Sequence, residues 1–204
     1  MVPLRLTSSA VRLPPPVATA RNMGDNAGMT IKPGWEGRVF EDFRVGGVYR
    51  HPLGRTITQT DNIWFTLLTV NSNPLHFDAA LAAQTEFGRP LVDSTLTLAV
   101  VTGLSVADVS QNAVNLGWSD VRLPHPVFEG DTLHAESEVL AARASRSRPA
   151  MGIVRVKTTG VNQDGAVVIE FERTVMVYRR GHVPRAPRPA ARRPASGKKE
   201  NGRR

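Results

Sequence analysis

The stretch Asp93–Leu104, "DSTLTLAVVTGL", decides the fold of this 204-residue chain. Asp93 or Ser94 is a natural cap for a helix start, and every residue from Leu96 to Leu104 is apolar or small. A helix without a polar face is buried on all sides. The stretch is also shorter than the roughly 18–20 apolar residues of a membrane span. It therefore predicts one helix at the centre of a globular fold, and no membrane partner.

Three strands are expected to follow this helix. The segment 121–143 holds a turn at Glu129–Asp131 and then a strand, and segments 151–165 and 166–180 alternate apolar with polar residues. The letters "NQDG" (162–165) favour a hairpin, because Asp-Gly readily takes positive φ angles. Together these elements predict an α+β fold, in which a curved antiparallel sheet wraps around a central buried helix.

Shorter elements precede the central helix. Residues 48–57 predict a strand, which Pro52 places at an edge or bulge. A helix is expected to begin at Thr58 or two residues later and to end near Asn71, because the letters "NP" that follow cannot continue it. The segment Asp78–Phe87 predicts a short helix capped by its aspartate. The longer of these helices carries an apolar stripe at helical spacing: Ile63, Trp64, Leu67 and Leu68.

The net charge of +8 lies at the two ends of the chain. Of 26 Lys and Arg residues, four fall in 1–33 and eight in 181–204, with one acidic residue in each segment. The remaining 14 basic and 16 acidic residues leave 34–180 close to neutral, without the basic footprint of a nucleic-acid-binding protein. We therefore interpret 34–180 as the folded domain, 1–33 as a disordered extension and 181–204 as a basic disordered tail.

The compartment is indicated only indirectly. The first 33 residues contain Arg, Ser and Thr but few acids, as organellar transit peptides do. However, the letters "LPPP" (13–16) would break an amphipathic helix there, and Met23 or Met29 is an alternative start. We expect an extension without structure and a cytoplasmic protein. The chain has no cysteine, so disulfides, thiol nucleophiles and thiolate metal sites are excluded.

The stretch 71–78, "NSNPLHFD", is the first candidate for chemistry. His76 lies in a turn fixed by Pro74, and histidine can take or give a proton near neutral pH. Asn71 and Asn73 can orient a water or a carbonyl group but cannot act as bases. The alternative is a plain turn in which the amides cap the backbone and His76 is a passive surface residue.

The start of the central helix is the second candidate. Its first N–H groups, near Ser94 and Thr95, carry partial positive charge and need acceptors. Such a helix start can stabilise a developing oxyanion. The alternative is that Asp93 and Ser94 simply cap the helix.

Other kinds of site find little support. The histidines outside the turn show no metal-ligand spacing: His51, His125, His134 and His182. The sequence has no GxSxG motif, no phosphate-cradling glycine loop and no dinucleotide fingerprint. We predict no metal site and no hydrolase of the Ser–His–Asp type.

Three segments together resemble the MaoC-like dehydratase family, which includes R-specific enoyl-CoA hydratases. They are "NSNPLHFD" (71–78), "FGRPLVDSTLTLAVVTG" (87–103) and "VRLPHPVFEGDT" (121–132), in the family's order and spacing. The resemblance covers residues 40–178 and implies a hotdog fold, usually dimeric, with acyl-CoA bound at the subunit interface. It also implies reversible hydration of a 2-enoyl-CoA thioester, so coenzyme A is part of the substrate and no separate cofactor is expected.

The family motif Gly-Asp-x-Asn-Pro-(Leu/Ile/Val)-His-x-Asp matches at residues 73–76 and at Asp78. The family's catalytic histidine falls on His76. Its catalytic aspartate falls on Asn71, and the glycine before it falls on Val70. One half of the family's catalytic pair is therefore an amide here.

Further positions follow from the same resemblance. The family's usual His-Gly at the start of the central helix is here Asp93-Ser94, and Thr102 stands where these hydratases often have a hydroxyl. The surrounding text, including "NIWFTLLT" (62–69) and "GIVRVKTTG" (152–160), is similar to a branch that includes β-methylmalyl-CoA dehydratase, or mesaconyl-CoA hydratase. A dicarboxylic substrate of that kind needs a cation for its free carboxylate, and Arg55 and Arg89 are the candidates.

The resemblance implies a hydro-lyase that works as a homodimer. His76 would transfer the proton, Asn71 would hold the water, and Asp78 or Asp93 would be the second carboxylate. Loss of the usual aspartate supports an alternative, a non-catalytic acyl-CoA-binding subunit or regulatory module. A nucleic-acid-binding protein would have to use the tails, and a thioesterase shares the fold but not the letters "NPLHFD".

Overall fold

The structure, a computed structural model, describes residues 34–187. The expectation of disorder over 1–33 concerns residues outside this range, and so does that over 181–204 except for residues 181–187, which the structure describes. In chain order the helical elements are η1 (Phe40–Asp42), α1 (Gln59–Thr69), η2 (Pro74–His76), α2 (Ala79–Ala82), α3 (Ser94–Leu104) and η3 (Val106–Ser110). The strands are β1 (Val48–Arg50), β2 (Arg55–Thr56), β3 (Ala113–Arg122), β4 (Thr132–Ala144), β5 (Met151–Val161) and β6 (Val167–Tyr178).

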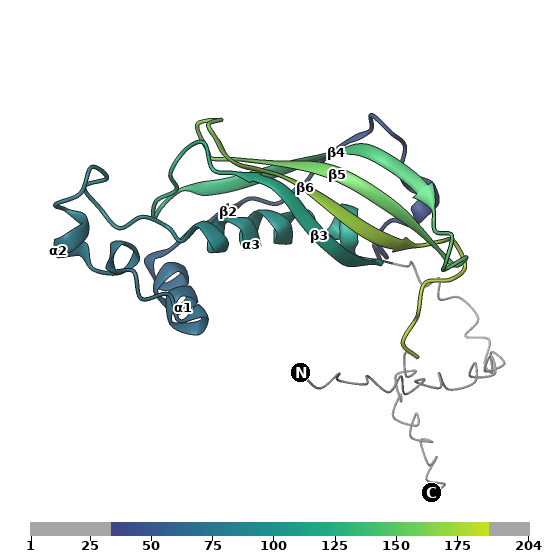
Figure 1. Ribbon diagram of the computed structural model, residues 1–204, viewed down its shortest axis with the longest axis horizontal. Coiled ribbons are helices and arrows are strands. Elements are labelled where there is room, and N and C mark those ends of the chain that lie inside the picture. Colours follow the sequence, from purple (N-terminus) through teal and green to yellow (C-terminus); the bar gives the residue numbers. More distant parts are fainter. Residues whose placement is uncertain (1–33, 188–204) are drawn as a thin grey trace, which may run out of the picture. The chain divides into compact units, whose positions relative to one another are not determined.

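One antiparallel sheet dominates the fold. Its order from edge to edge is β1-β4-β5-β6-β3, and β2 also pairs with β4. The sheet curves around α3, which packs against β4, β5 and β6 (Figure 1). Helices α1 and α2 lie at the end where α3 begins (Figure 1). This arrangement confirms the predicted α+β layout of a curved sheet around a central helix.

Strand β4 shows how the sequence pattern builds the sheet. Leu133, Ala135, Ser137 and Val139 are buried, while the residues between them are exposed. Successive side chains of a strand point to opposite faces, so this alternation turns one face of β4 toward α3 and the other toward solvent.

The predicted hairpin joins β5 to β6. The Asn162 side-chain oxygen accepts hydrogen bonds from the N–H groups of Asp164 and Ala166, and Gly165 has a φ of +80°. Glycine takes such an angle without steric cost. The letters "NQDG" therefore form the turn that the sequence predicts.

The core contains two clusters. The first lies around α3 and includes Ile57, Leu96, Val101, Ile169 and Phe171. The second lies toward the other end of the sheet, around Val139, Val154, Val156 and Val175. A Cβ atom at position 160 would come within 2.7 Å of the Val101 side chain. The glycine there is therefore what lets α3 approach β5 so closely.

Helix α3 is not buried on all sides, so that part of the prediction is wrong. Leu96, Thr97 and Val101 are buried against the sheet, but the residues at 95, 99 and 103 are exposed. The cause is that the sheet covers only one side of the helix. Within residues 34–187 no helix is long and apolar enough to cross a membrane.

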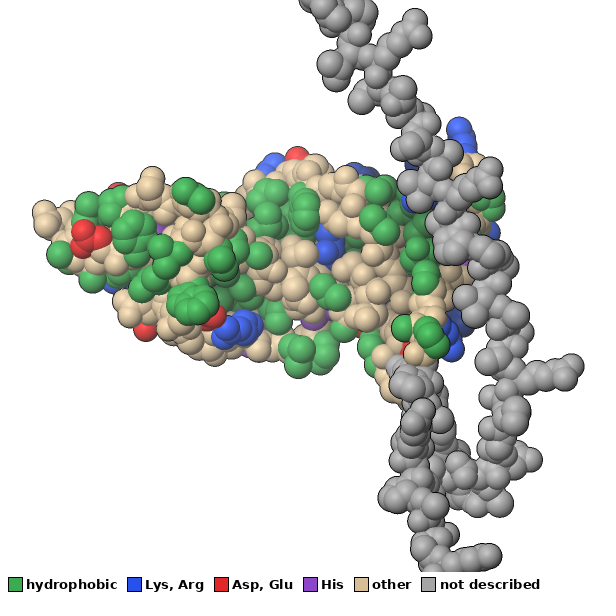
Figure 2. Space-filling view, turned by 90° about the horizontal axis from the view of Figure 1, so that it is seen from below, with side chains coloured by type: hydrophobic (Ala, Val, Ile, Leu, Met, Phe, Trp, Pro, Cys, Tyr) green, Lys and Arg blue, Asp and Glu red, His purple; other side chains and the backbone are tan. Residues whose placement is uncertain are grey.

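Helix α1 begins as predicted but turns its apolar stripe outward. Thr58 and Asp61 form a reciprocal capping box at its start. Of the four stripe residues, Trp64, Leu67 and Leu68 are 65%, 73% and 78% exposed. Figure 2 shows hydrophobic side chains gathered at the end of the molecule that holds α1 and α2. The buried face of α1 is instead polar.

Two other predictions need correction in detail. The strand expected over 48–57 is broken around Pro52 into β1 and β2, both at the β4 edge of the sheet. The edge position is confirmed, because proline cannot donate to a ladder. The helix expected over 78–87 is shorter, since α2 ends at Ala82 and the chain continues in turns to Gly88.

Candidate active site

The turn between α1 and α2 is built by its own side chains. The side-chain oxygen of Asn73 accepts from the N–H of Leu75 and so caps η2, which ends at His76. Asp78 caps α2 by accepting from two backbone N–H groups. The motif is therefore a pair of capped turns, and these hold the histidine between two helices.

His76 is held in one orientation by a backbone carbonyl. Its side chain is largely buried, with 9% of the residue exposed, and Nδ1 lies 2.8 Å from the carbonyl oxygen of Leu91. A carbonyl can only accept, so in the neutral ring Nδ1 carries the proton. Nε2 then presents a lone pair, and among the described residues it has no hydrogen-bond partner. This ring nitrogen can take up a proton from a ligand.

Asn62 ties the site together from the buried face of α1. Its side-chain nitrogen donates to the carbonyl oxygens of His76, at 2.8 Å, and Leu91, at 3.0 Å. Its side-chain oxygen accepts from the N–H of Asp93 at 2.9 Å. The Asn62 amide therefore joins three parts of the site: the turn that holds His76, the segment around Leu91, and Asp93, the N-cap of α3.

Sequence reasoning did not find Asn62. The available signal was weak: Asn62 and Thr66 lie one helical turn apart on the face opposite the apolar stripe. Such a polar face normally faces solvent. Here both residues are buried, because the carbonyl groups that Asn62 satisfies come from distant segments.

Asn71 and Asp93 are brought into direct contact. The Asn71 side-chain nitrogen donates to Oδ2 of Asp93 at 2.5 Å, and its oxygen accepts from the N–H of Asn73. Asn71 therefore stands beside the start of α3. Its second amide hydrogen remains for a ligand, because each side-chain amide has two.

Asp93 is a buried, ionised cap. Burial alone would raise the pKa of its carboxyl, but hydrogen bonds from the Thr95 hydroxyl, the Asn71 amide and the N–H groups of Thr95 and Leu96 hold that pKa below its ordinary value. The carboxylate is therefore charged at neutral pH. The Asp93 carboxylate accepts in each of these hydrogen bonds. It therefore orients Asn71 and caps the helix, and it has no proton to donate.

One N–H at the start of α3 is left for a ligand. Thr95 and Leu96 donate to the Asp93 side chain, and Thr97 donates to the Asp93 carbonyl. In the described part of the chain the N–H of Ser94 donates to no acceptor, and Ser94 is exposed. Partial positive charge gathers at such a helix start. This N–H can therefore bind the oxygen of a thioester.

A hollow of about 470 Å³ adjoins Asn71. It is lined mostly by apolar side chains from α1 and the turn: Ile63, Thr66, Leu67, Val70, Asn71, Ser72 and Phe77. The Asn71 amide thus stands between an apolar hollow and the start of α3. An alkyl group of a ligand fits such a lining.

Four predicted residues are not brought to this cluster. Asp78 is occupied in capping α2, and Thr102 lies eight residues beyond Ser94, about 12 Å along α3. The Arg55 guanidinium pairs with Asp61 on α1. Arg89 lies over the Phe128 ring, with its central carbon 4.0 Å from the ring centroid. Of the two arginines only Arg89 lacks an acidic partner among residues 34–187.

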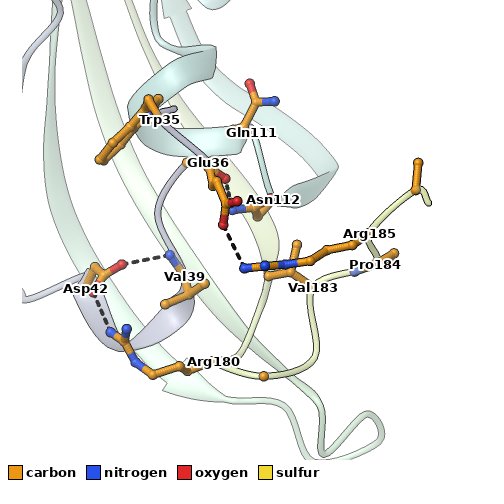
Figure 3. A pocket seen from close by; sticks show the side chains of 13 residues that line it. Trp35, Glu36, Val39, Asp42, Gln111, Asn112, Arg180, Val183, Pro184 and Arg185 are labelled. Atoms are coloured by element: carbon orange, nitrogen blue, oxygen red, sulfur yellow. Dashed lines mark hydrogen bonds and ion pairs between the residues drawn. The ribbon is translucent and has the colours of Figure 1, made fainter. Parts of the chain in front are cut away.

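A larger hollow, of about 850 Å³, lies past the other end of α3 (Figure 3). It is enclosed by the segment before η1, the residues after η3 and the C-terminal segment. Its charged side chains bind each other: Arg180 pairs with Asp42, and Arg185 with Glu36. No residue of the Asn71–Asp93 cluster lines it.

A buried histidine elsewhere has a structural role. His51 Nδ1 lies 3.0 Å from Asp108, and Nε2 lies 2.9 Å from the Ser137 hydroxyl, which also contacts Thr158. The order serine–histidine–aspartate is that of a hydrolase triad. However, Ser137 is fully buried, so no substrate can reach it, and the network instead fastens the β1–β2 connection to β4 and η3.

The sequence of this chain is similar to those of known hydratases. A mesaconyl-CoA hydratase of Cereibacter sphaeroides is 38% identical over 160 residues, which are 75% of this chain and 45% of that protein. The (R)-specific enoyl-CoA hydratase of Aeromonas caviae is 35% identical over 112 residues, 54% of this chain and 79% of that protein. The chain spans less than half the length of the first of these relatives.

Two solved structures resemble the fold of this chain. A MaoC domain dehydratase from Chloroflexus aurantiacus superposes with a TM-score of 0.70 at 35% identity, covering 80% of this chain and 46% of that one. A Mycobacterium tuberculosis protein with a double hotdog fold gives 0.66 at 25% identity, covering 72% and 46%. The fold is therefore a hotdog, of the class found in MaoC-like proteins.

The particular family follows from the whole length of the domain. The family model described as mesaconyl-CoA hydratase matches residues 28–195. The chain belongs to this family.

Proposed function

We propose that this protein reversibly hydrates a short-chain 2-enoyl-CoA to a 3-hydroxyacyl-CoA. The observation that carries the proposal is the orientation of His76. Its Nδ1 is bound to the Leu91 carbonyl, and its Nε2 is left free for a substrate proton. The family relationship supports the same class of reaction, since the relatives named above are hydratases.

In the dehydration direction the reaction breaks two bonds. Nε2 of His76 takes the proton from the carbon α to the thioester, and the C–O bond at the β-carbon breaks. The imidazolium then gives that proton to the departing hydroxyl, which leaves as water. Positioned proton transfer of this kind contributes about 10²–10⁴ in rate. The free amide hydrogen of Asn71 would hold the hydroxyl during the transfer.

The enolate that develops at the thioester needs a donor. The N–H of Ser94, at the positive end of α3, would supply it, with Thr95 beside it already bound to Asp93. Removing one such donor typically costs about 10²–10³ in rate. We propose no role in the chemical step for Thr102 or Asp78, because neither lies in this cluster.

The substrate class is proposed from the family: a dicarboxylic thioester such as mesaconyl-CoA. Its free carboxylate needs a cation. Arg89 lies outside the cluster, but it is the better of the two predicted arginines because Arg55 is paired with Asp61. Coenzyme A is part of this substrate, and the proposed chemistry requires no cofactor. The described residues contain no group of three or more His, Asp and Glu suited to a metal ion.

We propose a homodimer. Apolar residues are exposed on the edge strand β3, including Val114, Leu116 and Trp118, and an unpaired edge normally finds a cover. The open face of α3 needs one too. The C. sphaeroides relative is more than twice as long as the matched segment, so a second copy would supply what its other half supplies. In this proposal residues 34–180 are the catalytic domain, and the protein works in the cytoplasm.

A specific observation favours a second candidate, a non-catalytic acyl-CoA-binding module. The family's catalytic acid is an amide here, and that amide is bound to Asp93. The two candidates separate in one experiment. Purified protein is incubated with enoyl-CoA and 3-hydroxyacyl-CoA esters, including mesaconyl-CoA, and conjugated absorbance is followed. Turnover supports the enzyme. Binding by calorimetry without turnover on the whole panel supports the module.

A further inference from the structure

Val70, the residue between α1 and Asn71, has an unfavourable backbone. Its φ is 58° and its ψ is 28°, in the left-handed region. For a β-branched residue this conformation is an outlier, and helix ends of this kind usually have glycine or asparagine. The turn requires it: the Asn71 N–H returns to the Thr66 carbonyl at 2.9 Å, which closes the end of α1.

The Val70 side chain does not contribute to packing in the core of the fold. It is 86% exposed and belongs to neither core cluster. Considered as a helix end alone, this position favours glycine. Strained residues cluster at active sites and ligand-binding segments, where the surrounding structure holds them. The unexplained feature is therefore the isopropyl group, because the turn itself would be easier without it.

The isopropyl group lines the apolar hollow next to Asn71. Leu67 and Phe77 line the same hollow, of about 470 Å³. Asn71 also lines it, and the Asn71 amide reaches Asp93 at the start of α3. An acyl group whose thioester oxygen sits at that helix start would have its α- and β-carbons beside the Asn71 amide. The adjoining apolar wall is then the wall its alkyl substituents meet.

We propose that Val70 is a specificity-determining residue, whose isopropyl group contacts the alkyl branch of the acyl-CoA. This proposal rests on the proposed function and goes beyond it by naming the residue that selects the acyl group. A methyl or methylene contact in an apolar pocket discriminates between substrates by about 10–200-fold. Selection of the acyl group would explain why a valine is kept at this strained position.

Two variants separate the contact from the backbone. Val70→Ala removes the isopropyl group but keeps a Cβ that restrains the turn. Val70→Gly removes both and relieves the strain. Leu68→Ala is the matched control, because Leu68 is 78% exposed on α1 but does not line the hollow. For each protein, kcat and KM are measured with branched mesaconyl-CoA and with fumaryl-CoA, which lacks only the methyl branch, together with Tm and molar mass by light scattering.

We expect both Val70 variants to lose preference for the branched thioester by about tenfold or more in the ratio of kcat/KM values. The loss should lie mainly in KM, and Leu68→Ala should keep the wild-type ratio. Val70→Gly should also raise Tm. A raised Tm with an unchanged ratio would overturn the proposal and make Val70 a tolerated strain. An unchanged ratio with a weakened dimer would overturn it in favour of a contact with a second subunit.

Failure of the proposed function gives a different result. If the wild type hydrates no thioester, the affinity for the same two thioesters is measured by calorimetry. A selective loss of affinity for the branched thioester in Val70→Ala would still support the contact. Equal affinities in wild type and variant, or no binding at all, would overturn it.

Discussion

The Asn71 amide nitrogen lies 2.5 Å from Oδ2 of Asp93, so an amide and a carboxylate share the start of the central helix. In the family pattern the first position is an aspartate, and the second is the histidine of His-Gly. Both positions differ in this chain, and they differ together. A carboxylate at 71 would face the carboxylate at 93, whereas an amide can donate to it. The amide at 71 is therefore compatible with the carboxylate at 93, whereas an aspartate at 71 would repel it.

Exchange of the pair gives the first prediction. Asn71→Asp should place two carboxylates in contact, raise the pKa of one of them and lower stability at pH 7 by about 1.5–3 kcal/mol, the value of a hydrogen bond to a charged group. Its pH–rate profile should gain an acidic limb. Combining it with Asp93→Asn restores one amide and one carboxylate, and Tm should recover. Thermal and chemical denaturation of wild type, Asn71→Asp and the double variant check this. A double variant no more stable than Asn71→Asp alone would contradict it.

The lowered pKa of Asp93 gives a second prediction, for stability against pH. A carboxyl whose pKa is lower in the folded state contributes stability above its unfolded pKa, near 3.9, and loses that contribution as pH falls through the folded pKa. Wild type should therefore be more stable than Asp93→Asn at pH 7, and the difference should shrink below about pH 4. Urea denaturation at both pH values measures it. A difference that is constant with pH would show that the charge of Asp93 is not involved.

A third prediction concerns Asn62 as a positioning residue. Asn62→Leu keeps the approximate size but leaves the carbonyls of His76 and Leu91 with fewer donors. Stability should fall by about 1–3 kcal/mol per buried group left unsatisfied. In folded protein kcat should fall more than KM rises, because the histidine is no longer held. Thr69→Val is the control, since its hydroxyl bonds only within α1 and Thr69 does not line the hollow. Equal kcat in both variants would remove Asn62 from the site.

The buried guanidinium of Arg173 gives a fourth prediction. Arg173 is 2% exposed, its only hydrogen bond among the described residues is to Ser105, and burial lowers its pKa to about 10. It is thus charged at pH 7, and a charge whose folded pKa is lowered costs stability at every pH below that value. Arg173→Met should stabilise the protein by roughly 1–4 kcal/mol, as replacing buried charged groups often does. A drop in Tm would contradict this prediction.

Much of the fold follows from local pattern. The apolar run at 96–104, the alternation along β4 and the Asp-Gly turn at 164–165 each specify their element through short-range physics, and the structure has all three. The outward stripe of Trp64 and Leu67 was not predictable in the same way. Whether an apolar helix face packs inward depends on which elements lie next to it. In this chain no described element covers the apolar face of α1.

The site divides along the same line. The turn that holds His76 and the helix start at Ser94 could be predicted, because a capped turn and a helix start are local signals. The contacts of Asn62 with Leu91 and of Asn71 with Asp93 span 29 and 22 residues. No periodicity or propensity encodes such pairings. In the sequence Asn71 could therefore be recognised only as a difference from the family motif, and its contact with Asp93 could not be predicted.

The central claim is that His76 carries the proton, and one measurement tests it most directly. Wild type and His76→Ala are compared for hydration of one accepted 2-enoyl-CoA, with kcat/KM followed against pH and Tm recorded for both. The account predicts a loss of about 10²–10⁴ in kcat/KM, disappearance of the histidine limb from the pH profile and a folded variant. A folded His76→Ala that keeps wild-type kcat/KM and the same pH profile would contradict it.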